Sequence, residues 1–175
     1  MDTTILKTGD VLHCAGKRLI SKMIRWATRS KFNHTALFIE LWGQPYIIDA
    51  QENGVNVKPF DQWEKEYGYN YIVTRPPFDI DEKRTAVKAM SKVGLTAYDF
   101  EGLLLKQPIE LLTGKWKKKK GEHEQDKMYC SEFVAWVYYV NDSYKTSPAD
   151  FLEFCKLNKW TLITGTDQKL IEAYK

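Results

Sequence analysis

The chain has 175 residues, a length typical of one domain, so we expect a single domain over residues 1–175. Hydrophobic residues make up 43% of the sequence, which excludes a chain that is disordered throughout. The net charge of +3 is too small by itself to indicate a nucleic-acid-binding protein. Only three scattered cysteines are present, namely Cys14, Cys130 and Cys155. They exclude a disulfide framework and a paired-cysteine zinc site, and they fit a reducing compartment.

The sequence lacks the common signals for insertion into or passage across a membrane. No apolar run approaches the roughly 18 residues of a membrane-spanning helix. Residues 1–7 lack the basic and apolar regions of a secretory signal. These features predict a cytoplasmic protein, with a peripheral position on a membrane and export by a non-standard route as the alternatives.

The first half of the chain carries mainly strand patterns. Strands are expected at residues 11–14, 34–41, 44–50, 55–57 and 69–75. A turn at residues 42–44 joins the second and third of these strands into a hairpin, and Pro76 ends the last one. A short helix is expected at residues 59–67.

The second half of the chain is mainly helical. Helices are expected at residues 79–93, 95–112, 128–140 and 147–155, followed by a closing strand at residues 160–164. Gly94 suits a helix C-cap, and Ser147 followed by Pro148 is typical of a helix start. The helix at 128–140 is apolar on nearly every side, so we expect it to be central and buried.

Two segments concentrate positive charge. Residues 17–31 contain six basic and no acidic residues, and one face of the helix expected there carries Arg18, Lys22, Arg25 and Arg29. The second segment, Lys115–Lys120, surrounds Trp116 with lysines. Charge runs are usually solvated faces, but this composition is also typical of contact with an anionic membrane surface. Both interpretations stay open, and because no nucleic-acid-binding motif is present, we expect no nucleic-acid partner.

Cys130 differs from the other two cysteines because it falls in the first turn of an expected helix. A helix N-terminus presents unpaired N–H groups and the positive end of the helix dipole. Both favour a nucleophilic thiolate, and the same N–H groups can hold a developing oxyanion. Cys14 and Cys155 lack this setting and are expected to be structural. A buried structural cysteine is the alternative for Cys130 as well.

A cysteine nucleophile needs a base, and the base needs an orienting group. His34 begins the first strand of the hairpin and Asp49 lies near the end of the second, so antiparallel pairing can bring them together. Simple pairing about Gly43 would place Glu52 nearer to His34, and Gln51 is also close. Asp49 and Glu52 both stay open as the orienting acid, and a surface carboxylate at a strand end is the alternative for either.

These residues resemble motifs of the NlpC/P-sixty superfamily of papain-like cysteine peptidases. Residues 33–39 are similar to its histidine strand, residues 48–55 to the strand of the third triad residue, and residues 129–134 to its nucleophile motif. Because histidine and acid precede cysteine, the chain looks like the circularly permuted branch, the YiiX/YaeF-like proteins, which are related to the lecithin:retinol acyltransferase group. The resemblance covers roughly Gly9 to Thr164. One departure is Asp49, where the branch often carries Glu.

The resemblance implies an α+β, permuted papain-like (NlpC-type) fold, with a small antiparallel sheet or half-barrel packed on helices and the nucleophile at a helix N-terminus. It implies a cysteine peptidase or amidase in which Cys130 attacks an acyl carbonyl, His34 transfers the proton and Asp49 orients the imidazole. No metal or organic cofactor is implied. The implied substrate is a cell-wall peptide or a lipid-like acyl amide. The alternatives are a thiol acyltransferase and a catalytically idle module of the same fold that binds a lipid or another anionic ligand.

Overall fold

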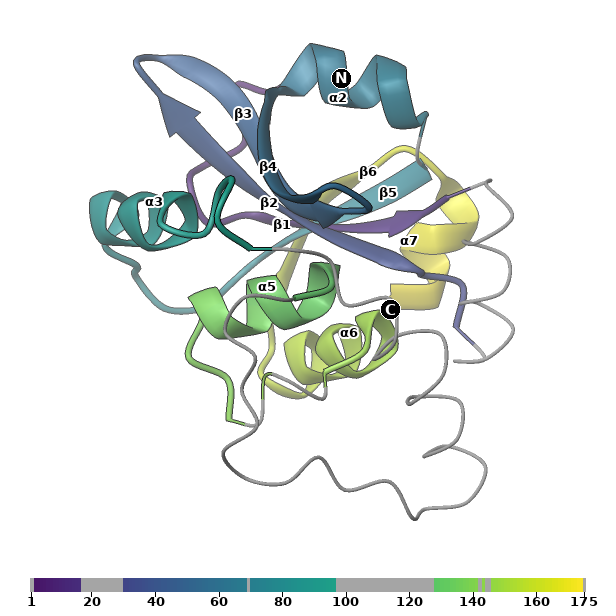
Figure 1. The fold of residues 1–175 in the computed structure, drawn as a ribbon. Helices are drawn as coiled ribbons and strands as arrows, with labels where there is room; N and C mark the ends of the chain where they lie inside the picture. Colours follow the sequence, from purple (N-terminus) through teal and green to yellow (C-terminus); the bar gives the residue numbers. More distant parts are fainter. Residues whose placement is uncertain are drawn as a thin grey trace.

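The computed structural model describes residues 2–16, 30–68, 70–96, 128–141, 143 and 146–174 (Figure 1). Three segments predicted from the sequence lie wholly or almost wholly outside these residues. They are the basic helix at 17–31, the helix at 95–112 and the cluster Lys115–Lys120. The membrane contact that depends on the first and third of these segments therefore stays a prediction.

The described residues form an α+β fold around one six-stranded sheet in which every neighbouring pair of strands is antiparallel. The strand order is β4-β3-β2-β1-β5-β6. The strands are β1 (Val11–Ala15), β2 (His34–Leu41), β3 (Gln44–Gln51), β4 (Gly54–Pro59), β5 (Asn70–Arg75) and β6 (Thr161–Gly165). All the strands expected from the sequence are present, with ends that differ by a few residues.

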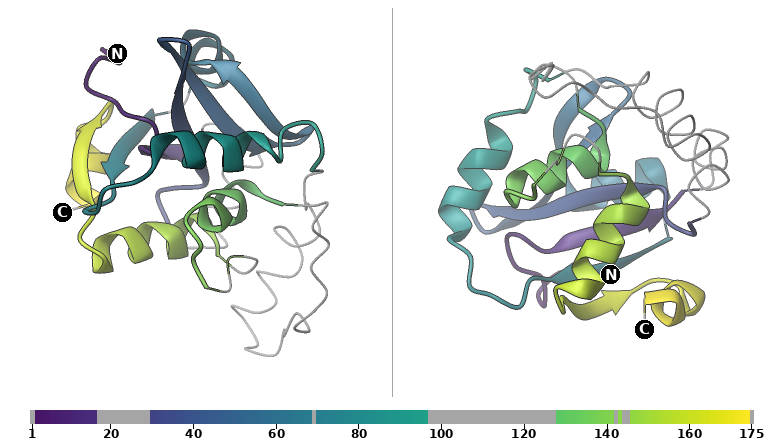
Figure 2. Two further views of the ribbon diagram at one scale, coloured as in Figure 1. Left: turned by 90° about the vertical axis from the view of Figure 1, so that its left-hand side faces the viewer. Right: turned by 90° about the horizontal axis from the view of Figure 1, so that it is seen from below.

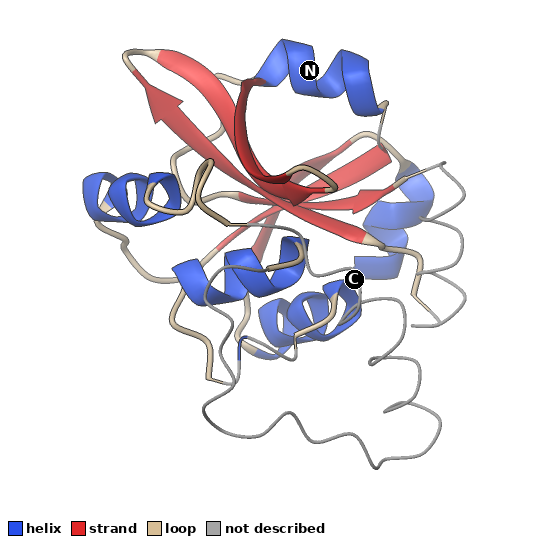
Figure 3. Ribbon diagram, viewed as in Figure 1, coloured by secondary structure: helices blue, strands red, loops and turns tan. Residues whose placement is uncertain are grey.

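Helices cover both faces of this sheet (Figure 3). They are α2 (Phe60–Tyr67), α3 (Glu82–Met90), α5 (Cys130–Val137), α6 (Pro148–Leu157) and α7 (Gln168–Tyr174). Helix α2 lies on one face, whereas α5 and α6 pack on the other with α3 beside them (Figures 1 and 2). The sequence predicted the first four helices but not α7, because seven residues are too few to establish a helical period.

Alternation of side chains along the strands divides the apolar residues between two main cores. The core under α5 and α6 includes Val11, Leu37, Ile39, Ile48, Ala50, Phe133, Val134 and Phe151. The core under α2 includes Leu12, Cys14, Ala36, Phe38, Ile47, Phe60, Trp63 and Tyr71. The central strands are therefore buried on both faces, so a polar side chain on them needs a partner inside the protein.

The β2–β3 hairpin closes in a two-residue turn rather than the three-residue turn expected from the sequence. Leu41 pairs with Gln44, and the residues between them, Trp42 and Gly43, have φ values of 53° and 72°. Positive φ at both central residues is typical of a type I′ turn, the turn that suits strand twist. This length sets the register of the hairpin, and a shift of one residue would move every side chain of β3 to the other face.

Candidate active site

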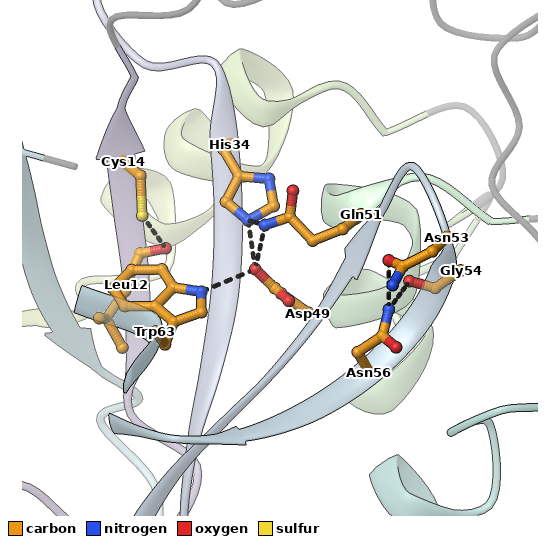
Figure 4. A network of polar contacts seen from close by, with 9 residues as sticks. All are labelled: Leu12, Cys14, His34, Asp49, Gln51, Asn53, Gly54, Asn56 and Trp63. Carbon is orange, nitrogen blue, oxygen red and sulfur yellow. Dashed lines mark hydrogen bonds and ion pairs between the residues drawn. The ribbon is translucent and has the colours of Figure 1, made fainter. Parts of the chain in front are cut away.

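His34 and Asp49 form a buried pair on the face of the sheet that α2 covers (Figure 4). His34 Nε2 lies 2.8 Å from Asp49 Oδ2. His34 is 5% exposed and Asp49 is 1% exposed. The hairpin register produces this contact, because Asp49 follows Ile47 by two residues and so shares the face of the α2 core.

Two further groups donate to the same oxygen of Asp49. Gln51 Nε2 lies 2.5 Å from Asp49 Oδ2, and Trp63 Nε1 lies 2.9 Å from it. Gln51 ends β3, whereas Trp63 belongs to α2 and is fully buried. An amide nitrogen and an indole nitrogen can only donate. Asp49 Oδ2 is therefore an acceptor for several N–H groups, as suits a buried carboxylate.

The donors around Asp49 assign the tautomer of His34. Because Oδ2 acts as an acceptor toward Gln51 and Trp63, we assign the proton between it and His34 to the imidazole Nε2. Gln51 Nε2 also lies 3.2 Å from His34 Nε2. With this tautomer both nitrogens are donors, and both donate to Asp49 Oδ2. His34 Nδ1, on the part of the ring away from Asp49 in Figure 4, carries the lone pair that can accept a proton.

Cys130 is the first residue of α5, as the sequence predicted. It is buried, and α5 packs against β2 and β3, the strands that carry His34 and Asp49. Two hydrogen bonds hold the start of this helix in place. The Glu132 carboxylate accepts from the Tyr129 N–H at 3.3 Å. The Ser131 hydroxyl donates to the Thr146 carbonyl at 2.7 Å. The first turn of α5 therefore directs backbone N–H groups toward the region around Cys130.

A second thiol, Cys14, belongs to the same neighbourhood. Cys14 is the partner of His34 in the β1–β2 register, and its side chain lies in the α2 core. Burial raises the pKa of the Cys14 thiol strongly; the interaction with His34 lowers this pKa, and the interactions with Asp49 and Cys130 raise it. His34, Asp49 and Cys130 therefore all lie within electrostatic range of one sulfur atom. His34 and Asp49 lie on the sheet face that α2 covers, whereas α5, which carries Cys130, packs on the other face. The direct approach of Cys130 to His34, around the start of β2, belongs to the proposal below.

The geometry separates the two acids that the sequence left open. Asp49 contacts His34, whereas Glu52 is exposed in the turn between β3 and β4. Trp63 was missed by the sequence analysis. The available signal was its type: a tryptophan in a buried position usually finds a partner for its N–H. Nothing in the sequence indicates which acid that partner is.

Two other kinds of site were sought in the part of the chain that the structure describes. Its residues include no group of three or more His, Cys, Asp or Glu placed to hold a metal ion. Among the same residues, no helix is both long enough and apolar enough to cross a membrane.

No family model matches the sequence. The uncharacterized protein YiiX of Escherichia coli strain K12 is 28% identical over 137 residues, which are 77% of this chain and 58% of YiiX. This chain thus spans less than two thirds of its curated relative. The crystal structure of metalloprotein YiiX from E. coli O157:H7 matches with a TM-score of 0.58 and 26% identity, over 80% of this chain and 68% of that one. Together, the two matches support homology of this chain to YiiX and a YiiX-like fold.

Proposed function

We propose that the protein is a cysteine hydrolase of permuted papain-like fold that cleaves an amide bond with Cys130, His34 and Asp49. The observation that carries the proposal is the buried contact of 2.8 Å between His34 Nε2 and Asp49 Oδ2. This contact favours the imidazole tautomer that a general base needs, at the start of a strand against which the Cys130 helix packs.

In the proposed reaction, His34 Nδ1 takes the proton of Cys130 and the sulfur attacks the carbonyl carbon. The first-turn N–H groups of α5 stabilise the oxyanion that forms. His34 then gives the proton to the leaving amine, the C–N bond breaks, and a thioester remains on Cys130. Water attacks the thioester with His34 as base, which releases the acid and restores the thiol. Asp49 stabilises the imidazolium and keeps the ring oriented.

The substrate class follows from the sequence resemblance and not from the geometry. We propose a cell-wall peptide or a lipid-like acyl amide. YiiX is described as a metalloprotein. The proposed steps are those of the side chains of Cys130, His34 and Asp49 and of the first-turn N–H groups of α5.

The first experiment measures hydrolysis of fluorogenic amides of short peptides and of N-acyl amino acids. We expect Cys130→Ala to lower kcat/KM by about 1,000-fold or more, because the nucleophile is lost. Cys155→Ala is the matched control, because Cys155 is a buried thiol on α6, and it should stay within about twofold of the unsubstituted chain. Circular dichroism verifies folding of both variants. Equal activity of Cys130→Ala and the unsubstituted chain would contradict the proposal.

A second measurement needs no substrate. Burial raises the pKa of both Cys14 and Cys155, so both are thiols near neutral pH and react slowly. We expect iodoacetamide at pH 7 to modify Cys130 first, as located by peptide mass spectrometry. Modification of Cys130 no faster than of the other two cysteines, together with no amide hydrolysis, would favour a binding module over an enzyme.

A further inference from the structure

We propose that Trp63 is a positioning residue of this site, whose indole N–H fixes the Asp49 carboxylate and thereby the tautomer of His34. This inference rests on the proposed function, because it assigns a role within the same Cys130–His34–Asp49 site. Trp63 comes from α2, outside the sheet that carries the histidine and the acid.

The position of Trp63 is itself fixed by packing. Its ring lies 6.3 Å from the ring of Phe60 and 6.0 Å from the ring of Tyr71, measured between centroids. Trp63 is fully buried, and all three rings belong to the core under α2. An indole in such a core cannot turn its N–H elsewhere without moving its neighbours. Trp63 therefore offers Asp49 one donor in one fixed direction.

The other donors to Asp49 are less constrained. Gln51 is half-buried at the end of β3, and its amide can rotate about its last side-chain bond. The imidazole of His34 gains and loses a proton during the proposed reaction, so it cannot hold the Asp49 carboxylate in one orientation. Without Trp63, the carboxylate could rotate and lose the orientation in which it accepts squarely from His34 Nε2. We infer that the Trp63 bond of 2.9 Å selects Oδ2 and holds it toward His34 Nε2.

Substitution of Trp63 can distinguish a role as hydrogen-bond donor from a role in packing alone. Trp63→Phe keeps a large aromatic ring in the core and removes only the N–H and part of the ring area. Trp160→Phe is the matched control, because Trp160 is also buried and its Nε1 has no hydrogen-bond partner among the described residues. Any effect common to both variants reflects loss of packing. An effect confined to Trp63→Phe reflects loss of the donor.

The experiment measures the tautomer of His34 by NMR of nitrogen-labelled histidine, in parallel with amide hydrolysis. We expect the Nε2–H tautomer to dominate in the unsubstituted chain and in Trp160→Phe, and to be mixed with the Nδ1–H tautomer in Trp63→Phe. For the same variant we expect kcat to fall about tenfold, the order of effect of one net hydrogen bond, with KM within about twofold.

An unchanged His34 tautomer and an unchanged kcat in folded Trp63→Phe would overturn the positioning role. Should Trp63→Phe fail to fold, site-specific replacement of Trp63 by benzothienylalanine removes the N–H at nearly constant shape and gives the same two readouts. Failure of the proposed function would be recognised separately, by full activity of Cys130→Ala, whatever tautomer His34 adopts.

Discussion

Asp49 is the acid that faces His34, and the proposed reaction gives its carboxylate a role in stabilising the imidazole. A carboxylate that accepts from His34 Nε2 stabilises the imidazolium formed when the histidine takes a proton. A neutral amide in its place loses this stabilisation, and it can also turn its own NH₂ group toward the imidazole. The hairpin register places Glu52 in an exposed turn, where its charge has little influence on a buried ring.

We therefore expect Asp49→Asn to lower kcat/KM about 100-fold, whereas Glu52→Gln stays within about twofold. Steady-state hydrolysis by the two variants at pH 7 makes the comparison, with thermal unfolding as the check on folding. A greater loss in Glu52→Gln than in Asp49→Asn would show that the assignment of the acid is wrong.

His13 is a buried histidine of β1 that the proposed reaction does not use. Its ring lies near those of Phe32 and Phe151, and its Nε2 lies 2.9 Å from Thr74 Oγ1. Burial lowers the pKa of His13 to about 3. In the unfolded chain a histidine titrates near 6.5. Below that pH, His13 binds a proton in the unfolded state but not in the folded state. The free energy of unfolding therefore decreases as the pH is lowered, until about pH 3.

His13→Gln should remove this contribution while keeping a polar partner for Thr74. Between pH 7 and pH 5, we expect the free energy of unfolding of the unsubstituted chain to fall by about 2 kcal/mol more than that of the variant. Urea unfolding at the two pH values measures the difference. Parallel losses in both proteins would rule out His13 as the titrating group.

At the level of elements, the β2–β3 turn sets the register that brings Asp49 beside His34, and it does so with an unfavourable backbone conformation at Trp42. Trp42 is 90% exposed and has positive φ, which is unfavourable for a bulky residue. Asn followed by Gly is the preferred pair for a type I′ turn. The present turn therefore keeps its conformation through the pairing of the strands rather than through its first residue.

Trp42→Asn should raise the free energy of unfolding by about 1 kcal/mol, because asparagine tolerates positive φ better. Hydrolysis should be unchanged, because the register that places Asp49 beside His34 is kept. Gly43→Ala is the opposing control and should destabilise the chain, since Gly43 also has positive φ. A Trp42→Asn variant that unfolds more easily than the unsubstituted chain would contradict this account.

For the whole molecule, the candidate site draws on separate parts of the chain. The sheet supplies His34 and Asp49, α2 supplies Trp63, and α5 supplies Cys130. Figure 2 shows the helices on either side of the sheet that carry the last two residues. The chain order of histidine, acid and cysteine is compatible with the proposed reaction, because catalysis depends on the arrangement of groups in space.

Local features of the structure followed from the sequence. The apolar β pattern over residues 34–41 and 44–50 predicted the two hairpin strands. Ser147 before Pro148 predicted the start of α6, where the serine Oγ accepts from the Asp150 N–H at 3.1 Å. Cys130 was also placed correctly at a helix start. Each of these predictions depends on residues a few positions apart, which interact in the same way in many folds.

The choice of acid and its partner depended on the tertiary structure. Glu52 stayed open as the alternative to Asp49 until a turn of two residues fixed the register of β3. Trp63 lies 14 positions from Asp49 along the chain and reaches it only because α2 folds back over the sheet. The sequence alone determined all the described strands and every described helix except α7, together with the kinds of side chain at their ends, because those follow from short-range backbone preferences. Packing between distant segments decided which of those side chains meet, because contact across a sheet face has no local pattern.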